Sequence, residues 1–200
     1  LSLCNKNFQK INNYSSKAKH DLLLEVCMAA KYEGESLEKY RKQYDSKYQD
    51  YGSTICTILA RSFADIGDII RGKDLYLGDK KKKQTEREKL EQKLKEIFGK
   101  IHSGLDDKIK SKYNGDTKDY FQLREDWWTA NRHTVWKAIT CDEENKIGDA
   151  QYFRQTCNDD ETLSYANHKC RCTKSSGGKP GTNETDQVPT YFDYVPQYLR

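Results

Sequence analysis

Apolar side chains recur at helical spacing over much of this 200-residue chain, and that periodicity predicts a mainly α-helical fold. The apolar positions of residues 54–70 cover more than one face, so we expect this helix to be central and packed on several sides. A narrower apolar seam runs along residues 85–101 and indicates packing against one other helix. The predicted helices cover residues 17–32, 37–44, 54–70, 85–101 and 119–140.

Three glycines mark positions where the helical pattern should change. Gly34 is flanked by two glutamates, and we expect it to interrupt the pattern between residues 32 and 37. Gly67 lies inside the predicted central helix and indicates a close packing contact rather than an exposed turn. Gly104 should end the helix over residues 85–101. Thr85 and Glu88 should form a capping box at the start of the same helix.

Beyond Cys141 the helical period fades, and no alternating pattern there predicts a strand convincingly. Residues 173–187 form a flexible loop by composition, because they are rich in serine, glycine, threonine and lysine. Aromatic residues return over 188–196, and we expect this segment to bring the chain back to the core.

The composition is poor in aliphatic residues but not that of a disordered chain. Hydrophobic residues make up 35% and charged residues 33%, and the mean hydropathy is -1.03. Six Phe, three Trp and fourteen Tyr offset the aliphatic deficit, because each buries a large area. No apolar run approaches the roughly 20 residues that span a bilayer. The first residue is not methionine, and we interpret the chain as a fragment of a longer protein.

The seven cysteines predict crosslinks and an oxidising, extracellular compartment. Four of them fall within residues 141–172, a stretch too poor in aliphatic residues to hold itself together by burial alone. The odd count suggests a partner outside the chain, and Cys4 is the best candidate for that orphan. The disulfide candidates are Cys4, Cys27, Cys56, Cys141, Cys157, Cys170 and Cys172.

Other roles for these cysteines remain open from the sequence. Cys27 and Cys56 sit within apolar helical patterns, where burial as free thiols is about as reasonable as pairing. Zinc is disfavoured, because the chain has no Cys-x-x-Cys and its Cys-x-Cys matches zinc sites poorly. We therefore predict no metal, although a zinc site would draw on Cys157, His168, Cys170 and Cys172.

Positive charge is concentrated between residues 80 and 110, although the whole chain carries a net charge of only +4. Such a cluster attracts polyanions: sulfated polysaccharide, nucleic acid or anionic lipid. The extracellular compartment favours sulfated polysaccharide over nucleic acid, and lysine suits a disordered array of sulfates. The alternative is a solvated loop that leads into a helix with Glu and Lys pairs on its outer face. The candidate glycan-binding residues are Lys80, Lys81, Lys82, Lys83 and Arg87.

Nothing in the sequence supports an enzyme, and no motif for binding a nucleotide or another cofactor is present. Asp65 and Asp68 are three residues apart on one helix, where capping or ion pairing is more common than acid–base chemistry. Trp127 and Trp128 could stack a sugar or a base, but we expect one to pack inward and the other to cover a neighbouring helix, because adjacent helical residues point about 100° apart. The histidines fall in different predicted elements: His20, His102, His133 and His168.

Five strings of sequence occur in order and cover nearly the whole chain. They include DIGDII at residues 65–70, DWW at 126–128 and PQYLR at 196–200. These strings resemble the alpha class of Duffy-binding-like domains, which belong to Plasmodium falciparum erythrocyte membrane protein 1, a variant surface antigen. The full strings cover residues 22–34, 60–76, 124–132, 135–141 and 191–200.

The resemblance implies a disulfide-stapled helical bundle of the Duffy-binding-like type, with part of subdomain one and most of subdomain two. Residues 1–15 would be the end of subdomain one, and residues 16–172 the helical bundle core of subdomain two. Residues 173–187 would form a flexible variable loop, and 188–200 a return segment that leads towards subdomain three.

The resemblance also implies an adhesion module on the extracellular face of the infected erythrocyte, acting in cytoadhesion and rosetting. Implied partners are receptors on host erythrocytes or endothelial cells, including heparan sulfate, complement receptor 1 and blood-group sugars. The membrane would be reached only through a distant anchor outside this chain. In the alternative, the module binds a protein receptor and the basic run is incidental. Loops between the packed strings would carry receptor choice and antigenic variation.

Overall fold

A computed structural model describes residues 18–48, 55–74, 86–116, 118–141, 147, 150–159, 162–167, 169–172 and 188–200. The α-helices are α1 (Ala18–Tyr48), α2 (Ile55–Arg71), α3 (Glu86–Ser103), α4 (Asp107–Lys110) and α5 (Phe121–Ile139). Short 3-10 helices are η2 (Ser111–Tyr113), η4 (Phe192–Tyr194) and η5 (Gln197–Leu199), and the strands are β1 (Gln155–Asp159) and β2 (Thr162–Tyr165). The mainly α prediction is confirmed.

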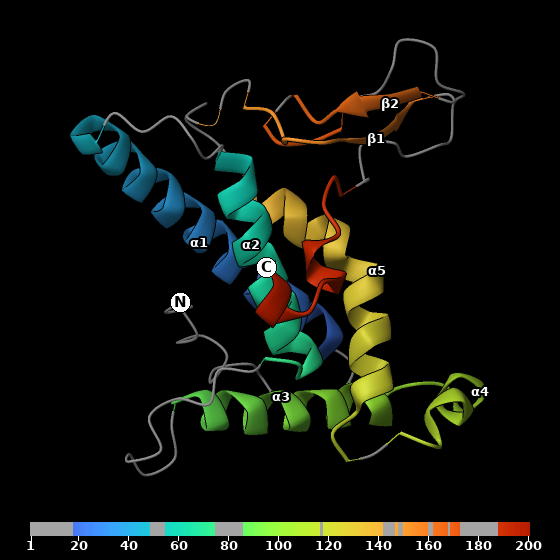
Figure 1. Cartoon of the computed structure of the whole chain (residues 1–200). Helices are drawn as coiled ribbons and strands as arrows, with labels where there is room; N and C mark the ends of the chain where they lie inside the picture. The colour runs from blue at the N-terminus through green and yellow to red at the C-terminus, as the bar shows by residue number, and fades with distance from the viewer. Residues whose placement is uncertain are drawn as a thin grey trace.

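Helices α1, α2 and α5 pack on one another and form the core (Figure 1). Helix α2 is central, as its apolar pattern predicts. Its Phe63 lies with ring centroids 5.1 Å from Trp128 and 5.2 Å from Trp136 of α5. Helix α3 lies across the lower ends of α2 and α5 in the view of Figure 1 and closes that end of the core. It does so with one buried apolar seam: Leu94, Ile97, Phe98 and Ile101.

The predicted interruption at Gly34 is wrong, because α1 continues through it as one helix. Gly34 is buried where α1 crosses the end of α5. A Cβ at this position would lie 2.1 Å from the backbone oxygen of Ile139, which no real side chain tolerates. The glycine therefore serves a close helix crossing, and tertiary packing overrides its weak helix propensity.

The other two glycines behave as predicted. A Cβ on Gly67 would lie 2.8 Å from the Trp128 ring, so the predicted close packing contact is confirmed. Helix α3 ends at Ser103, and the N–H of Gly104 donates to the carbonyls of Lys100 and Ile101. The expected cap at Thr85 falls outside the described residues.

A short antiparallel hairpin, which sequence analysis did not predict, follows the bundle. Strands β1 and β2 pair with Asn158 opposite Leu163, and a register irregularity falls between Gln155 and Cys157. The strands are short and partly polar, so they lack the alternation that identifies a longer strand. Their position is fixed by covalent and polar contacts instead of a large apolar face.

The terminal segment, residues 188–200, lies against α2 and in front of α5 (Figure 1). Val188, Thr190 and Asp193 in it are buried. The hairpin holds its beginning, because the Thr156 hydroxyl donates to the Pro189 carbonyl at 2.6 Å. The segment therefore joins the hairpin to the helical core, as the return of aromatic residues predicts.

We predict that Gly34→Ala destabilises the domain by about 1 to 3 kcal/mol, since the methyl group must push α1 away from α5. Chemical denaturation monitored by circular dichroism measures this free energy of unfolding. Gly115→Ala is the matched control, because an added Cβ there meets nothing within 4 Å. Equal stabilities of the two variants would contradict the close crossing.

Candidate functional site

The residues selected for glycan binding are only partly within the described structure. The lysine run, defined as Lys80, Lys81, Lys82 and Lys83, lies outside the described residues. Arg87 lies in the first turn of α3, where its guanidinium forms an ion pair with Asp74. Burial lowers the pKa of Arg87, and the negative charges of Asp65 and Glu91 oppose that shift. The charge of Arg87 is thus compensated within the fold.

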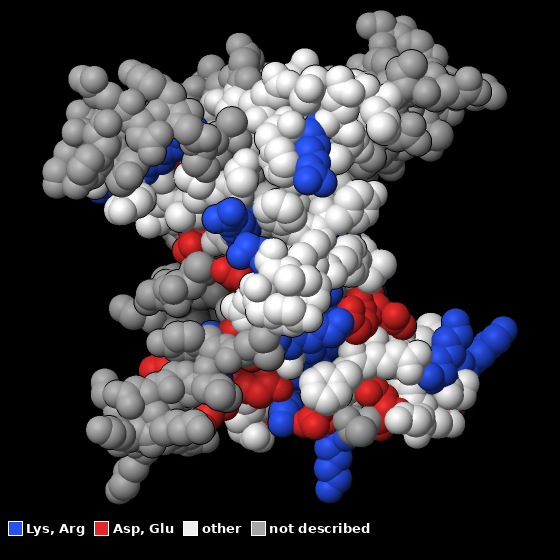
Figure 2. Space-filling view, in the orientation of Figure 1, with Lys and Arg blue, Asp and Glu red and all other residues white. Residues whose placement is uncertain are grey.

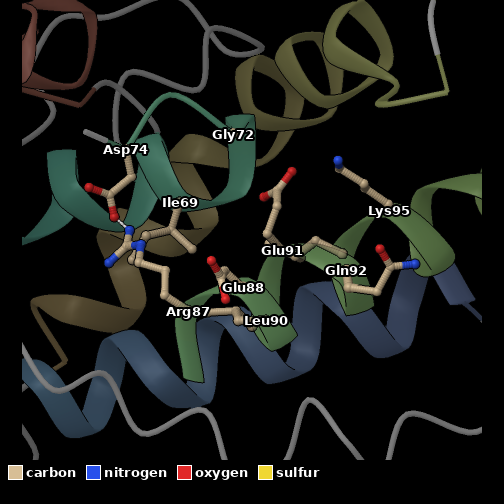
Figure 3. Close-up of a pocket in the computed structure, with 10 residues that line it drawn as sticks. Ile69, Gly72, Asp74, Arg87, Glu88, Leu90, Glu91, Gln92 and Lys95 are labelled. Carbon is tan, nitrogen blue, oxygen red and sulfur yellow. Dashed lines mark ion pairs between the residues drawn. The ribbon is translucent and has the colours of Figure 1, made fainter. Parts of the chain in front are cut away.

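Arg87 and Asp74 also border a pocket of about 450 Å³ between the end of α2 and one face of α3 (Figure 3). Its apolar lining comes from Ile69, Leu90 and Leu94. Charged and amide groups of α3 stand around this apolar part, and Figure 3 shows them on successive turns. A pocket of this kind has an apolar floor that a small ligand can contact and polar groups that can orient that ligand.

The charged groups of the pocket are paired with other residues. Glu91 accepts two hydrogen bonds from Arg124, with Nη1 to Oε1 at 2.7 Å and Nη2 to Oε2 at 2.9 Å. Lys95 Nζ lies 2.6 Å from a carboxylate oxygen of Asp119. Because its cations already have carboxylate partners, the pocket suits a neutral polar group better than a sulfate.

Arg124 also fixes the end of α2. Its buried guanidinium donates from Nε to the Ile70 carbonyl at 2.6 Å and from Nη2 to the Ile69 carbonyl at 3.1 Å. These are carbonyls that a helix end leaves without partners inside the helix. Gly72 follows with a φ of +72°, and a Cβ there would lie 3.0 Å from the Arg124 guanidinium. Glycine satisfies both the backbone conformation and the space that Arg124 requires.

Asp193 of the terminal segment is the centre of a second buried polar cluster. Its side chain is fully buried and accepts from Arg132 twice, with Nε to Oδ2 and Nη2 to Oδ1 both at 2.8 Å. Trp128 Nε1 donates to the same carboxylate at 2.9 Å. The Asp193 carbonyl accepts from Arg71 of α2. One residue therefore connects the terminal segment to both α2 and α5.

Asp65 and Asp68, considered above as an acid–base pair, serve in ion pairs. Both contact Arg200, and Asp68 also lies 2.9 Å from Arg71 Nη2. Burial raises the pKa of each carboxyl, and the charge of Arg200 lowers it. The interpretation of this pair as structural ion pairs is confirmed.

The two neighbouring tryptophans divide as predicted, because Trp128 packs against Phe63 in the core and Trp127 covers α3. Trp127 and Trp128 are buried. The Trp127 ring meets Phe98 of α3 edge-on, with centroids 6.1 Å apart. Neither ring is accessible for stacking on a sugar.

Two disulfides are formed among the described cysteines. Cys56 of α2 bonds to Cys170, and Cys157 of β1 bonds to Cys172. Cys27 and Cys141 are thiols, and Cys4 lies outside the described residues. The disulfides occupy the sulfurs that a zinc site would need at Cys157, Cys170 and Cys172.

Within the described ranges, no group of three or more His, Cys, Asp or Glu is placed to hold a metal ion. Across the same ranges, no helix has both the length and the apolar character needed to cross a membrane.

The buried charges of Arg71, Arg124 and Asp193, and the mostly buried Arg132, are functional parts of the frame that no motif in the sequence predicts. A signal for two of them exists, because Arg124, Trp128 and Arg132 are spaced by four residues and share one helix face. Two cations on the same face as a packed tryptophan indicate carboxylate partners on neighbouring elements. The identity of those partners is not readable from the spacing, since Asp193 lies 61 residues from Arg132.

The sequence model of the Duffy binding domain family matches residues 1–200. No curated protein matches the chain. Several solved structures are similar to it. One is the NTS-DBL1(alpha-1) domain of Plasmodium falciparum membrane protein 1 from the varO strain, with 38% identity and a TM-score of 0.71. That match covers 98% of this chain and 39% of the other, so this chain spans well under half its length.

Two further similar structures are beta-class domains, named DBLβ, of the same Plasmodium falciparum membrane protein 1 (PfEMP1). The ICAM-1-binding IT4var13 DBLβ domain is 34% identical with a TM-score of 0.64, over 99% of this chain and 39% of that one. A second DBLβ domain, bound to human ICAM-1, is 29% identical with a TM-score of 0.56, over 100% of this chain and 34% of that one.

We predict that Asp193→Ala lowers the free energy of unfolding by about 3 to 5 kcal/mol, because it leaves the mostly buried Arg132 guanidinium and the buried Trp128 indole without their carboxylate partner. Urea denaturation measures the loss, and Asp193→Asn should lose less because it keeps an acceptor. Glu86→Gln is the control, since it removes one negative charge from an exposed pair with Lys89 that contributes little. A loss as small as that of the control would exclude Asp193 as a central contact.

Burial raises the pKa of the Cys27 thiol from its ordinary 9.0 to about 11. At about pH 8 roughly one folded molecule in a thousand carries the thiolate, compared with one in ten when unfolded. Alkylation of Cys27 by iodoacetamide should therefore be about a hundredfold slower in the folded protein than in urea. The same shift lowers stability as the pH rises from 9.0 towards 11, because the unfolded thiol ionises first. Equal alkylation rates, measured by peptide mass spectrometry, would contradict the burial.

Proposed function

Because this chain belongs to the Duffy binding domain family, we propose that it is an adhesion module that binds receptors on host cells. Domains of this family are adhesion modules and not enzymes. The observation that carries the proposal is the similarity along nearly the whole chain to a domain that binds ICAM-1. On this proposal, the module acts on the extracellular face of the infected erythrocyte.

The buried polar clusters support a division between a fixed frame and recognition segments. Arg124 and Asp193 fix the ends of helices and the terminal segment to the core. Residues 173–187 follow a cysteine in a disulfide and precede the buried Val188. On this proposal, recognition resides in segments that the frame displays, including 75–85 and 173–187, where substitutions do not disturb the core.

Sulfated glycans such as heparan sulfate are the first partner class we propose. The lysine run supplies four adjacent positive charges, which attract a sulfated chain with strong salt dependence. Arg87 contributes less than the lysines, since it is paired with Asp74. Such binding would serve cytoadhesion and rosetting, for which complement receptor 1 and blood-group sugars are further candidate partners.

A protein receptor is the second candidate, and a specific observation favours it. Two of the similar structures are DBLβ domains in complex with ICAM-1. On this reading the lysine run is an incidental solvated surface, and apolar and aromatic contacts supply the affinity.

We predict that changing all four residues of the lysine run to Ala lowers the salt concentration at which the full chain elutes from a heparin column. The matched control changes four lysines that already have acidic partners: Lys73, Lys89, Lys93 and Lys95. Elution of the lysine-run variant at the wild-type salt concentration would show that the run does not bind glycan.

The same two variants separate the partner classes on cells. Binding of the labelled full chain to red cells and endothelial cells should fall with added heparin and with salt if glycan dominates. Binding that survives saturating heparin and high salt favours the protein receptor. Absence of binding to any host cell would overturn the adhesion proposal itself.

A further inference from the structure

The pocket between the end of α2 and α3 has an apolar floor on which a flat ring can lie. Leu94 closes the bottom and is fully buried, while Ile69 and Leu90 are only partly buried where they line the cavity. The volume of about 450 Å³ lies in the lower part of the range for ligand pockets. The cavity therefore admits one aromatic side chain more readily than a larger molecule.

Most of the charged groups around this floor already have partners of opposite charge. They form three ion pairs: Glu91 with Arg124, Lys95 with Asp119, and Arg87 with Asp74. A charged ligand would have to compete for one member of such a pair, and separating a partly buried ion pair is costly. We therefore expect the pocket to disfavour ligands that carry a carboxylate, a sulfate or an ammonium group.

Gln92 is the neutral polar side chain of the lining. It is exposed, and within the described part of the chain its amide has no hydrogen-bond partner. Figure 3 shows Gln92 on α3 near Lys95, away from the pair of Arg87 and Asp74. A side-chain amide has two N–H donors and a carbonyl acceptor. Gln92 can therefore both donate to and accept from a hydroxyl group at the mouth of the pocket.

The pocket also adjoins a segment that we propose as a recognition segment. Asp74 directly precedes residues 75–85, and Arg87 follows them after one intervening residue. Both residues line the pocket, and their ion pair brings the chain on either side of 75–85 together. A receptor that contacts residues 75–85 therefore has the pocket within reach.

We propose that this pocket accepts a tyrosine side chain presented by a protein receptor. The inference rests on the proposed adhesion function and specifies the chemistry of its protein-receptor alternative. The ring covers Ile69 and Leu90, and the hydroxyl group exchanges hydrogen bonds with Gln92. Tyrosine fits because it joins a large apolar surface to one neutral polar group. Aromatic side chains seated in pockets also supply much of the binding free energy of protein interfaces.

The test titrates the isotope-labelled full chain with N-acetyltyrosinamide, a neutral probe that carries the tyrosine side chain. Amide chemical shifts should change around Ile69, Gly72 and Leu90. The dissociation constant should be on the order of 1 mM, because one ring and one hydrogen bond bind weakly by themselves. N-acetylphenylalaninamide, which lacks the hydroxyl group, should bind about fivefold more weakly. The same derivative of para-carboxyphenylalanine, which carries a negative charge instead, should not bind.

Two variants and a matched control assign the binding to the pocket. Leu90→Trp places an indole in the cavity and should abolish binding of the probe. Gln92→Ala should weaken it about fivefold, since the hydroxyl group loses its partner. Gln122→Ala changes an exposed glutamine of α5 that does not line the pocket, so it should bind the probe as the wild type does. Circular dichroism confirms that each variant is folded. Binding of the full chain to host cells should fall with Leu90→Trp and stay unchanged with Gln122→Ala.

The inference is overturned if the neutral probe gives no saturable shifts, or if the carboxylate probe binds equally well. Equal affinities of the Gln92→Ala and Gln122→Ala variants would also exclude it. So would host-cell binding of Leu90→Trp as strong as that of the wild type, since the receptor would then not use the pocket. If the wild-type chain binds no host cell, the adhesion proposal fails, whereas the titration still decides whether the pocket accepts a tyrosine side chain.

Discussion

The buried carboxylate of Asp193 is the contact on which the arrangement of this domain depends. It neutralises Arg132 of α5, accepts from the Trp128 indole and sits on a backbone that accepts from Arg71 of α2. A buried charge is costly unless it is paired and fully hydrogen-bonded, so these partners must be assembled together. Helices α2 and α5 are thus held in one geometry by polar contacts as well as by their apolar core, and polar contacts are directional and tolerate few alternatives.

The strings that carry the resemblance to Duffy-binding-like domains meet at these contacts. Asp68 and Arg71 come from residues 60–76, Trp128 and Arg132 from 124–132, and Asp193 from 191–200. These residues contact one another inside the domain. The similarity to the solved domains therefore reports a shared frame, because the matching strings supply its buried contacts.

The helices and the central position of α2 could be predicted from the sequence, since apolar periodicity is a local signal. The uninterrupted α1 could not, because Gly34 is explained only by the Ile139 carbonyl of another helix. The hairpin was missed because its strands are short, and a disulfide to Cys172 helps to hold it in place. For the candidate site, residue type and clustering are enough to select lysines as candidate binding residues for a polyanion. Whether a lysine has an acidic neighbour, as Lys95 has in Asp119, depends on distances between elements that sequence spacing does not encode.

The anchors on either side of residues 173–187 bear on how much the length of this stretch can change. The Cys157–Cys172 bond fixes the chain just before this stretch, and the Thr156 hydrogen bond to Pro189 fixes it just after, both from the same strand. For a chain between two fixed ends, doubling the length costs only about 0.6 kcal/mol in closure entropy. If residues 173–187 form the loop that their composition predicts, a change in their number therefore costs the folded domain little, because both anchors on β1 stay in place.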